Sequence, residues 1–316
     1  MWCVDEDGSR CVDEGNGVDL TDAERKAGKS AFDFDDEETQ DLGSPTPPSA
    51  AADTMKIEDI VPDESNRAIL HKLRGNDTEF TKLWLSIGDV WDVKRKENEY
   101  RPEGTAHDVG WLGYYIGKNA CLNELHLSYL GNNANRDAFK SFCRGVNSNR
   151  SIQKIVFKDL DLSGGEIFRS LHPFFELNYH LSEIEMENCN FGSGSARWFA
   201  SALKGCNRSL TSIKIARIGR RDEQFSGTIK ALKRHPQLKE LKLQAMSIRR
   251  NECIALANLI SSTTTNLQVL NLYHNSITDE GVDALAGALT KSIYVNWSLH
   301  ATVPFRPGDI RVSQSC

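Results

Sequence analysis

The sequence predicts an α/β fold in which short strands and helices alternate and stack into a right-handed solenoid with a parallel sheet. Six segments share one spacing, in which apolar residues recur three and five positions after the first. Their starts lie 28–30 residues apart, at Leu122, Ile152, Leu181, Leu210, Leu238 and Leu267. Apolar residues at helical spacing occupy the second half of the repeats. A near-constant period of this length is typical of repeat proteins, in which each unit covers the apolar side of the next.

The first 54 residues are predicted to form an acidic, disordered arm. Residues 1–65 hold 19 acidic and five basic residues, although the whole chain has a net charge of only −6. Few large apolar residues occur here, and the stretch from Gly43 to Ala50 has the composition of a Pro/Ser linker. Such a segment cannot bury enough apolar surface to offset its ordering entropy. An acidic arm therefore precedes a basic body.

Residues 55–79 are predicted to form an N-terminal helical cap. Ile57, Ile60, Ile69, Leu70 and Leu73 follow a partly helical spacing. A solenoid needs such a unit to cover the apolar side of its first repeat.

The repeats are predicted to cover residues 80–295, in about seven units. An earlier match to the strand spacing starts at Phe80, 42 residues before Leu122, so an insertion near 89–105 is expected as a surface loop. In the last unit Thr278 is expected to cap a helix, and Asp279 and Glu280 suit its N-terminal dipole. After Leu289 the pattern dissolves, and residues 296–316 are expected to form an irregular cap or the end of a shortened repeat array.

The stretch from Asn266 to Val282 resembles a ribonuclease-inhibitor-type leucine-rich repeat, and the resemblance covers about residues 80–295. It implies a horseshoe with strands on the concave face, helices on the convex face and protein ligands on the concave side. In that family an Asn or Cys follows each strand and bonds the loop backbone. Cys189 and Asn275 match this position, whereas apolar residues replace it elsewhere, which implies looser loops; these are Leu130, Leu160, Ile218 and Met246.

No catalytic signature is present, so the chain is not expected to be an enzyme. The sequence lacks the phosphate-binding P-loop, the serine-nucleophile elbow, the zinc-binding helix motif and the dinucleotide-binding glycine motif. No Cys/His cluster has metal-ligand spacing. His126 on a strand is interpreted as a surface contact rather than a general base. No cofactor, metal or small-molecule substrate is therefore expected.

The strand pattern predicts which side chains face a partner, because residues of a strand alternate between its two faces. The third, fifth and seventh positions of each unit are expected to point away from the helices. The residues proposed to contact a partner are Trp84, Glu124, His126, Lys154, Lys158, Glu183, Glu185, Glu187, Lys214, Glu240, Lys242, Asn271 and Tyr273.

Two interpretations of these charges stay open. Glu183, Glu185 and Glu187 lie on one strand between strands that carry lysines, so the charges can simply pair laterally. Alternatively, the charge pattern selects a partner and speeds its arrival. Trp84 and Tyr273, near the two ends, are interpreted either as aromatic anchors for a partner or as side chains that cover a cap of the solenoid.

A basic rim is also predicted, formed by Arg217, Arg220, Arg221, Arg249 and Arg250. These arginines follow two neighbouring strands at similar repeat positions. They are interpreted either as solvated loop charges or as a site for acidic groups of a partner or of the segment Asp33–Glu38.

The leading functional interpretation is a non-catalytic module for protein–protein interaction. The alternative is regulation of a small GTPase, because Ran GTPase-activating proteins are built from repeats of this type and carry an acidic segment. There the segment follows the repeats, whereas here it precedes them. Nucleic acid is not favoured as a partner. The sequence shows no signal peptide and no apolar run of membrane-spanning length, so an intracellular, cytoplasmic protein is expected.

Overall fold

The computed structural model describes residues 55–290, except for 87–93, 103–105, 129–135, 207, 221–224, 263 and 265. The predicted acidic arm (1–54), the predicted tail (296–316), Leu130 and Arg221 lie outside the described residues. All statements below concern the described part of the chain.

Parallel strands alternate with helices, which confirms the predicted α/β class and its parallel sheet. The main sheet contains β1 (Lys82–Ser86), β2 (Glu99–Tyr100), β3 (Glu124–Ser128), β4 (Lys154–Lys158), β5 (Glu183–Glu187), β7 (Ser212–Ala216), β9 (Glu240–Gln244) and β10 (Val269–Asn271). These strands lie in the order β10-β9-β7-β5-β4-β3-β1-β2. A second, small sheet pairs β6 (Asn190–Phe191) with β8 (Gly219–Arg220).

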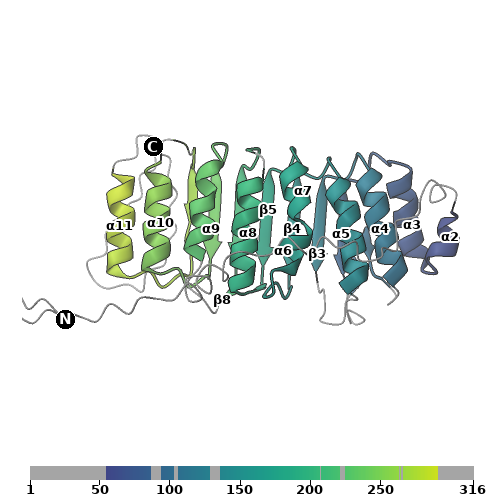
Figure 1. Cartoon of the computed structure of the whole chain (residues 1–316), viewed down its shortest axis with the longest axis horizontal. Coiled ribbons are helices and arrows are strands. Elements are labelled where there is room, and N and C mark those ends of the chain that lie inside the picture. Colours follow the sequence, from purple (N-terminus) through teal and green to yellow (C-terminus); the bar gives the residue numbers. More distant parts are fainter. Residues whose placement is uncertain are drawn as a thin grey trace, which may run out of the picture. The chain divides into compact units, whose positions relative to one another are not determined.

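The helices stand side by side in chain order and cover one face of the sheet (Figure 1). They are α2 (Ile57–Ile60), α3 (Glu64–Arg74), α4 (Ala106–Lys118), α5 (Arg136–Ser148), α6 (Glu166–Ser170), α7 (His172–Leu177), α8 (Ser193–Gly205), α9 (Phe225–Ala231), the 3₁₀ helix η3 (Leu232–Arg234), α10 (Arg250–Ile260) and α11 (Asp279–Leu289). No helix in the described ranges combines the length and the apolar composition needed to cross a membrane.

The strand register agrees with the repeat alignment from the sequence. Leu83 pairs with Leu125, Leu125 with Ile155, and Ile155 with Ile184. The same column continues through Ile213, Leu241 and Leu270. Each repeat position is therefore stacked on its equivalents, so the side chains of each predicted position form a column across the sheet.

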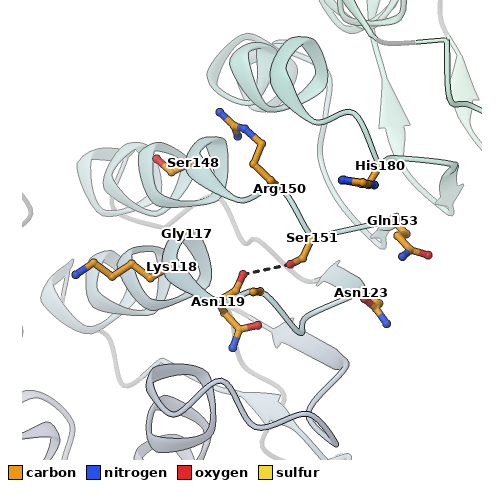
Figure 2. Close-up of a pocket in the computed structure, with 10 residues that line it drawn as sticks. Gly117, Lys118, Asn119, Asn123, Ser148, Arg150, Ser151, Gln153 and His180 are labelled. Atoms are coloured by element: carbon orange, nitrogen blue, oxygen red, sulfur yellow. Dashed lines mark hydrogen bonds between the residues drawn. The ribbon is translucent and has the colours of Figure 1, made fainter.

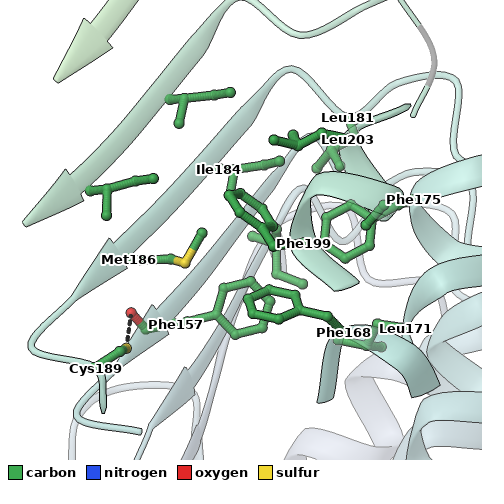
Figure 3. Close-up of a cluster of buried hydrophobic side chains, with 14 of the residues drawn as sticks. Phe157, Phe168, Leu171, Phe175, Leu181, Ile184, Met186, Cys189, Phe199 and Leu203 are labelled. Atoms are coloured by element: carbon green, nitrogen blue, oxygen red, sulfur yellow. Dashed lines mark hydrogen bonds between the residues drawn. The ribbon is translucent and has the colours of Figure 1, made fainter. Parts of the chain in front are cut away.

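The core lies between the sheet and the helices, and its centre is built of phenylalanines. Phe168 on α6 is completely buried, and its ring centroid lies 5.5 Å from that of Phe157 and 5.0 Å from that of Phe199. Figure 3 shows the three rings close together, with Ile184 of β5 above them and Met186 to their left. The phenylalanine contacts join neighbouring repeats, because Phe157 belongs to β4 and Phe199 to α8.

Buried asparagines hold the turns that lead from each helix to the next strand. Asn149 is completely buried; its amide donates to the carbonyls of Ile116 and Asn119, and its side-chain oxygen accepts from the backbone N–H of Ile152. Asn119 and Asn178, at the equivalent positions, accept in the same way. Each side chain thus satisfies backbone groups of a turn that would otherwise be buried without partners.

The loops after the strands follow a second regular pattern. Asn275 accepts from the N–H groups of Met246 and Ile248 and donates to the carbonyl of Leu243, which is the role that the resemblance implied for it. The Cys189 thiol lies 3.5 Å from the carbonyl oxygen of Phe157, a weaker version of the same contact.

Two expectations about local structure need correction. The insertion near 89–105 is not only a surface loop, because Glu99 and Tyr100 pair in parallel with Trp84 and Leu85 and are buried at the sheet's edge. Thr278 occupies the N-cap position of α11, but its side chain makes no capping hydrogen bond. Asp279 and Glu280 lie in the first helical turn, as expected.

Candidate functional site

The candidate site is the sheet face turned away from the helices, which we call the open face. It carries the third, fifth and seventh side chains of each repeat, as the alternation predicts. Most of these side chains are partly exposed, whereas Ser86, Ser128, Val156 and Ser212 are buried although they were expected to point outward. A neighbouring side chain explains two of these, because Glu99 of the insertion bonds Ser86, and Ser86 bonds Ser128.

Ion pairs between neighbouring strands cover the centre of the open face. Lys154 on β4 contacts Glu185 at 3.1 Å and Glu183 at 3.8 Å, both on β5. Lys158 contacts Glu187 at 3.2 Å, and Arg217 also contacts Glu187. Burial acts to lower the pKa of Lys154, but its contacts with Glu185, Glu124 and Glu183 outweigh burial and raise it. The acidic row predicted on β5 is therefore neutralised laterally.

A second group of charges lies on β7 and β9. Glu240 contacts Lys242 at 2.6 Å and Lys214 at 3.6 Å, and it accepts a hydrogen bond from Ser212. Burial acts to raise the pKa of the Glu240 carboxyl, but these contacts outweigh it and lower the pKa. The structure thus brings Lys214, Glu240 and Lys242 together.

An aromatic cluster occupies the N-terminal end of the open face. Trp84 on β1 stacks on His126 of β3 with ring centroids 4.8 Å apart. The Lys82 ammonium lies 5.2 Å from the Trp84 ring and the Lys96 ammonium lies 6.0 Å from it. Glu124 accepts from Lys82 and lies 3.0 Å from the His126 ring nitrogen. We call Lys82, Trp84, Lys96, Glu124 and His126 the aromatic cluster.

Burial is the largest influence on the pKa of His126 and lowers it. The bond to Glu124 acts in the opposite direction, and the nearby charges of Lys82 and Lys154 lower the pKa further. His126 is therefore neutral at pH 7 and presents a flat, uncharged ring beside Trp84.

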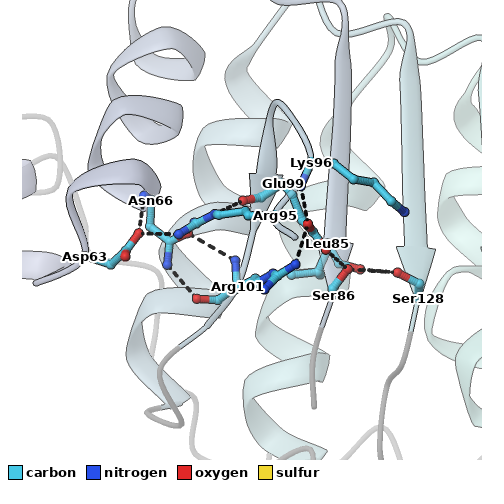
Figure 4. A network of polar contacts seen from close by, with 9 residues as sticks. All are labelled: Asp63, Asn66, Leu85, Ser86, Arg95, Lys96, Glu99, Arg101 and Ser128. Carbon is cyan, nitrogen blue, oxygen red and sulfur yellow. Dashed lines mark hydrogen bonds and ion pairs between the residues drawn. The ribbon is translucent and has the colours of Figure 1, made fainter. Parts of the chain in front are cut away.

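A polar network holds the insertion against the start of the sheet (Figure 4). Arg95 contacts Asp63 at 2.9 Å and donates to the Glu99 carbonyl. The Glu99 carboxylate accepts from Ser86, from the Lys96 N–H and from Arg101. Burial acts to raise the pKa of Glu99, but these hydrogen bonds outweigh it and lower the pKa. The network positions Lys96 beside Trp84. The residues of this network follow no repeat spacing, so the strand pattern does not predict them.

The C-terminal end of the described sheet carries the second predicted anchor. Tyr273 follows β10 and is 40% exposed, and Asn271 accepts from its backbone N–H. The Tyr273 ring lies 3.9 Å from the His274 ring. Trp84 and Tyr273 thus lie near opposite ends of the same face, as their repeat positions predict.

The described arginines of the predicted basic rim are engaged within the chain. Arg217 contacts Glu187, and Arg250 contacts Glu280 at 2.9 Å. Arg249 precedes α10, and its backbone N–H donates to Glu252. Arg220 lies in β8, where only its backbone is described, and Arg221 lies outside the described residues. No group of His, Cys, Asp and Glu within the described ranges has the geometry of a metal site.

Comparisons with known proteins support the repeat character. A family model described as a leucine-rich repeat matches residues 264–286. The human "NACHT, LRR and PYD domains-containing protein 13" is 33% identical to this chain over 110 residues, which make up 34% of this chain and 10% of that protein. The chain is thus similar to a small part of a much longer protein. Leucine-rich repeats generally mediate contacts between proteins, and they are generally not enzymes. Assignment to the ribonuclease-inhibitor type stays a prediction.

Proposed function

We propose that this chain is a non-catalytic interaction module that binds a protein partner on the open face of its sheet. The observation that carries the proposal is the aromatic cluster, in which a Trp–His stack stands partly exposed between two lysines. Rigid aromatic side chains with charged neighbours are the groups that most often dominate binding energy at protein interfaces.

The rest of the open face supports the same function in a different way. The charges at its centre are already paired with one another, so a partner can lie across them without leaving a buried charge alone. Such a surface contributes to the choice of partner more than to affinity. We therefore expect the aromatic cluster and Tyr273 to supply most of the binding energy. The paired charges determine where along the open face the partner lies.

The proposal includes a concave shape for the open face, in line with the resemblance, and it keeps the expected intracellular location as a prediction. Within the described residues we find no feature that favours the alternative of regulating a small GTPase.

The test is affinity capture with the full chain, followed by measurement of dissociation constants with each purified partner. We expect Trp84→Ala to weaken binding at least about tenfold, which corresponds to about 1.4 kcal/mol. Ile254→Ala is the control. Ile254 is an apolar residue on α10 and not on the open face, and its exposed fraction of 41% is close to the 40% of Tyr273, the second anchor on that face. Partners that bind wild type and both variants equally would show that the open face is not the binding site.

A further inference from the structure

The helices of the repeats all run in the same direction, because every strand is parallel to its neighbours and every crossover is alike. Acidic residues lie at helix starts, such as Glu166, Asp279 and Glu280. Basic residues lie at helix ends, such as Lys118 and Lys204. Each arrangement suits the helix dipole. The edge where helices begin is nevertheless mixed in charge, because it also carries Arg217, Arg249 and Arg250 of the predicted basic rim.

The edge where helices end and strands begin is the more uniform of the two. Five successive turns from α4 to β9 lie along it, and the described residues of four of them, all but the turn after α7, carry exposed Lys or Arg side chains. We call this set the basic edge: Lys118, Arg150, Lys204, Arg208, Lys233, Arg234 and Lys239. In the described part of these turns the one carboxylate is Glu176, at the end of α7. Three of the cations, Arg150, Arg208 and Lys239, lie beyond the helix ends, so dipole compensation does not account for them.

Several cations of the basic edge have no carboxylate partner. Arg150 donates only to the carbonyls of Asn147 and Asn149, and Arg234 donates to the carbonyl of Lys204. Lys204 and Lys239 form no ion pair with a described carboxylate. The cations of the open face, in contrast, are paired with glutamates from neighbouring strands. Apart from Lys96 of the aromatic cluster, the cations without a carboxylate partner among the described residues therefore lie mainly on the edge and not on the face.

Repeat register aligns two of the arginines with an exposed aromatic ring. Arg150, Tyr179 and Arg208 each lie two residues before the first apolar residue of their unit, at Ile152, Leu181 and Leu210. Hydrogen bonds keep the turns in register, since Ser151 donates to the carbonyl of Leu122 and Ser209 to that of Leu181. Tyr179 is 62% exposed, and Leu177 at the end of α7 is 40% exposed.

A polar groove lies beside this column. Its volume is about 470 Å³, and its lining includes Lys118, Arg150 and His180 from three successive turns. Figure 2 shows these side chains around Ser151, Asn123 and Gln153, whose hydroxyl and amide groups can bond a peptide backbone.

We propose that the basic edge is a second binding surface, which takes an acidic peptide segment of a partner protein with at least one large apolar residue. The cations from Arg150 to Lys239 fit its carboxylates, and Leu177 with Tyr179 fits its apolar side chain. The groove supplies polar groups for the peptide backbone. A peptide is favoured over nucleic acid because the described part of this edge pairs one exposed aromatic ring, Tyr179, with the apolar Leu177, whereas single-stranded nucleic acid is held by several successive aromatic platforms. This surface is separate from the open face, so either proposal can fail without the other.

The test is fluorescence anisotropy of the full chain with a labelled peptide of alternating glutamate and phenylalanine. We expect binding at 50 mM salt that weakens steeply towards 300 mM salt, as charge pairing requires. The double variant Lys204→Glu, Lys239→Glu should weaken binding at least about tenfold. A peptide with alanine in place of phenylalanine should bind wild type more weakly, and Tyr179→Ala should abolish that difference.

A matched control separates a site from general charge attraction. The double variant Lys56→Glu, Lys94→Glu changes the net charge equally at exposed positions outside the basic edge. If it weakens binding as much as the edge variant, the proposal is wrong. Stronger binding of a single-stranded oligonucleotide of equal charge than of the peptide would also overturn it. Circular dichroism of each variant confirms that the fold is retained.

Discussion

Five residues at the same repeat position share a left-handed backbone conformation, although none of them is glycine; four directly follow a strand, and His274 lies three residues after the end of β10. Their φ values lie between 50° and 59°, at Asp159, Asn188, Arg217, Ala245 and His274. The N–H of Ala245 donates to the carbonyl of Tyr273 in the next repeat, and that of Arg217 to the carbonyl of Gln244. The contact between repeats therefore holds each residue in a conformation that a Cβ atom disfavours.

Replacing Ala245 with glycine should stabilise the fold. Relief of the left-handed conformation is worth about 1–2 kcal/mol, and the added flexibility of the unfolded chain costs about 0.5–1 kcal/mol. We expect the free energy of unfolding, measured with denaturant, to rise by up to about 1 kcal/mol. Ala231→Gly is the control, because Ala231 has an ordinary helical φ of −64°. There the substitution relieves no strain, so only the destabilisation from the more flexible unfolded chain applies. Equal destabilisation by both substitutions would refute the argument.

His126 should make stability depend on pH. Its pKa lies below the ordinary value of 6.5, chiefly through burial, so the unfolded chain binds more protons than the folded chain at mildly acidic pH. The stability that neutral His126 contributes is fully present above pH 6.5. It is lost as the pH falls from 6.5 towards the lower pKa that His126 has in the folded protein. Glu124, Lys82 and Lys154 are the charged groups that act on it.

The measurement is the free energy of unfolding from about pH 5.5 to about pH 7.5, which is roughly one unit on either side of the ordinary histidine pKa. Wild type should lose more stability on acidification than His126→Gln does. An NMR titration of the His126 ring gives the pKa directly. Identical pH slopes for the two proteins would contradict the prediction.

At the residue scale, the sequence period predicts which side chains share the open face but not how far each is covered. Trp84, His126 and Tyr273 lie where alternation places them. The burial of Ser86 and Ser128 depends on Glu99, which reaches them from an insertion without repeat spacing. The period carries no information on such long-range contacts.

Among the elements, α4 and α5 pack unusually closely through glycines. A Cβ atom on Gly145 would lie 2.1 Å from the carbonyl group of Gly113, and one on Gly117 would lie 2.5 Å from the carbonyl oxygen of Gly145. These distances are far below van der Waals contact and involve backbone atoms, so a side chain could enter only if the helices moved apart.

Gly145→Ala should therefore destabilise the fold by about 1–3 kcal/mol, as overpacking of an ordered interior does. Gly227→Ala is a matched control, because a Cβ atom on Gly227 in α9 meets nothing within 4 Å. The Gly227→Ala variant should be as stable as wild type or more stable by up to about 1 kcal/mol, because alanine has the higher helix propensity. Thermal unfolding of the two variants measures both effects, and a stabilised Gly145→Ala protein would contradict the packing argument.

At the element scale, the sequence predicts strands better than turns. Each predicted strand is present because its apolar spacing is strict. The period of the strands does not identify the asparagines that hold the turns, although Asn119, Asn149 and Asn178 all lie three residues before the first apolar residue of their units. That spacing was a readable signal. No such spacing precedes the strand β2. Its pairing depends on long-range contacts, in which Arg95 binds both Asp63 and the Glu99 carbonyl.

For the described repeats as a whole, each unit contacts its sequence neighbours, so stability should respond locally to a local change. Phe168→Ala removes a completely buried ring that contacts Phe157, Phe191 and Phe199, and should cost about 3–5 kcal/mol. In hydrogen exchange, amides of β4 and β5 should lose the most protection, whereas β1 and β10 should lose less. Phe225→Ala is the matched control. In that variant the amides of β7 and β9 should lose the most protection from hydrogen exchange. An equal loss in all strands would mean that the repeats unfold as one cooperative unit, and would contradict the prediction of a local response.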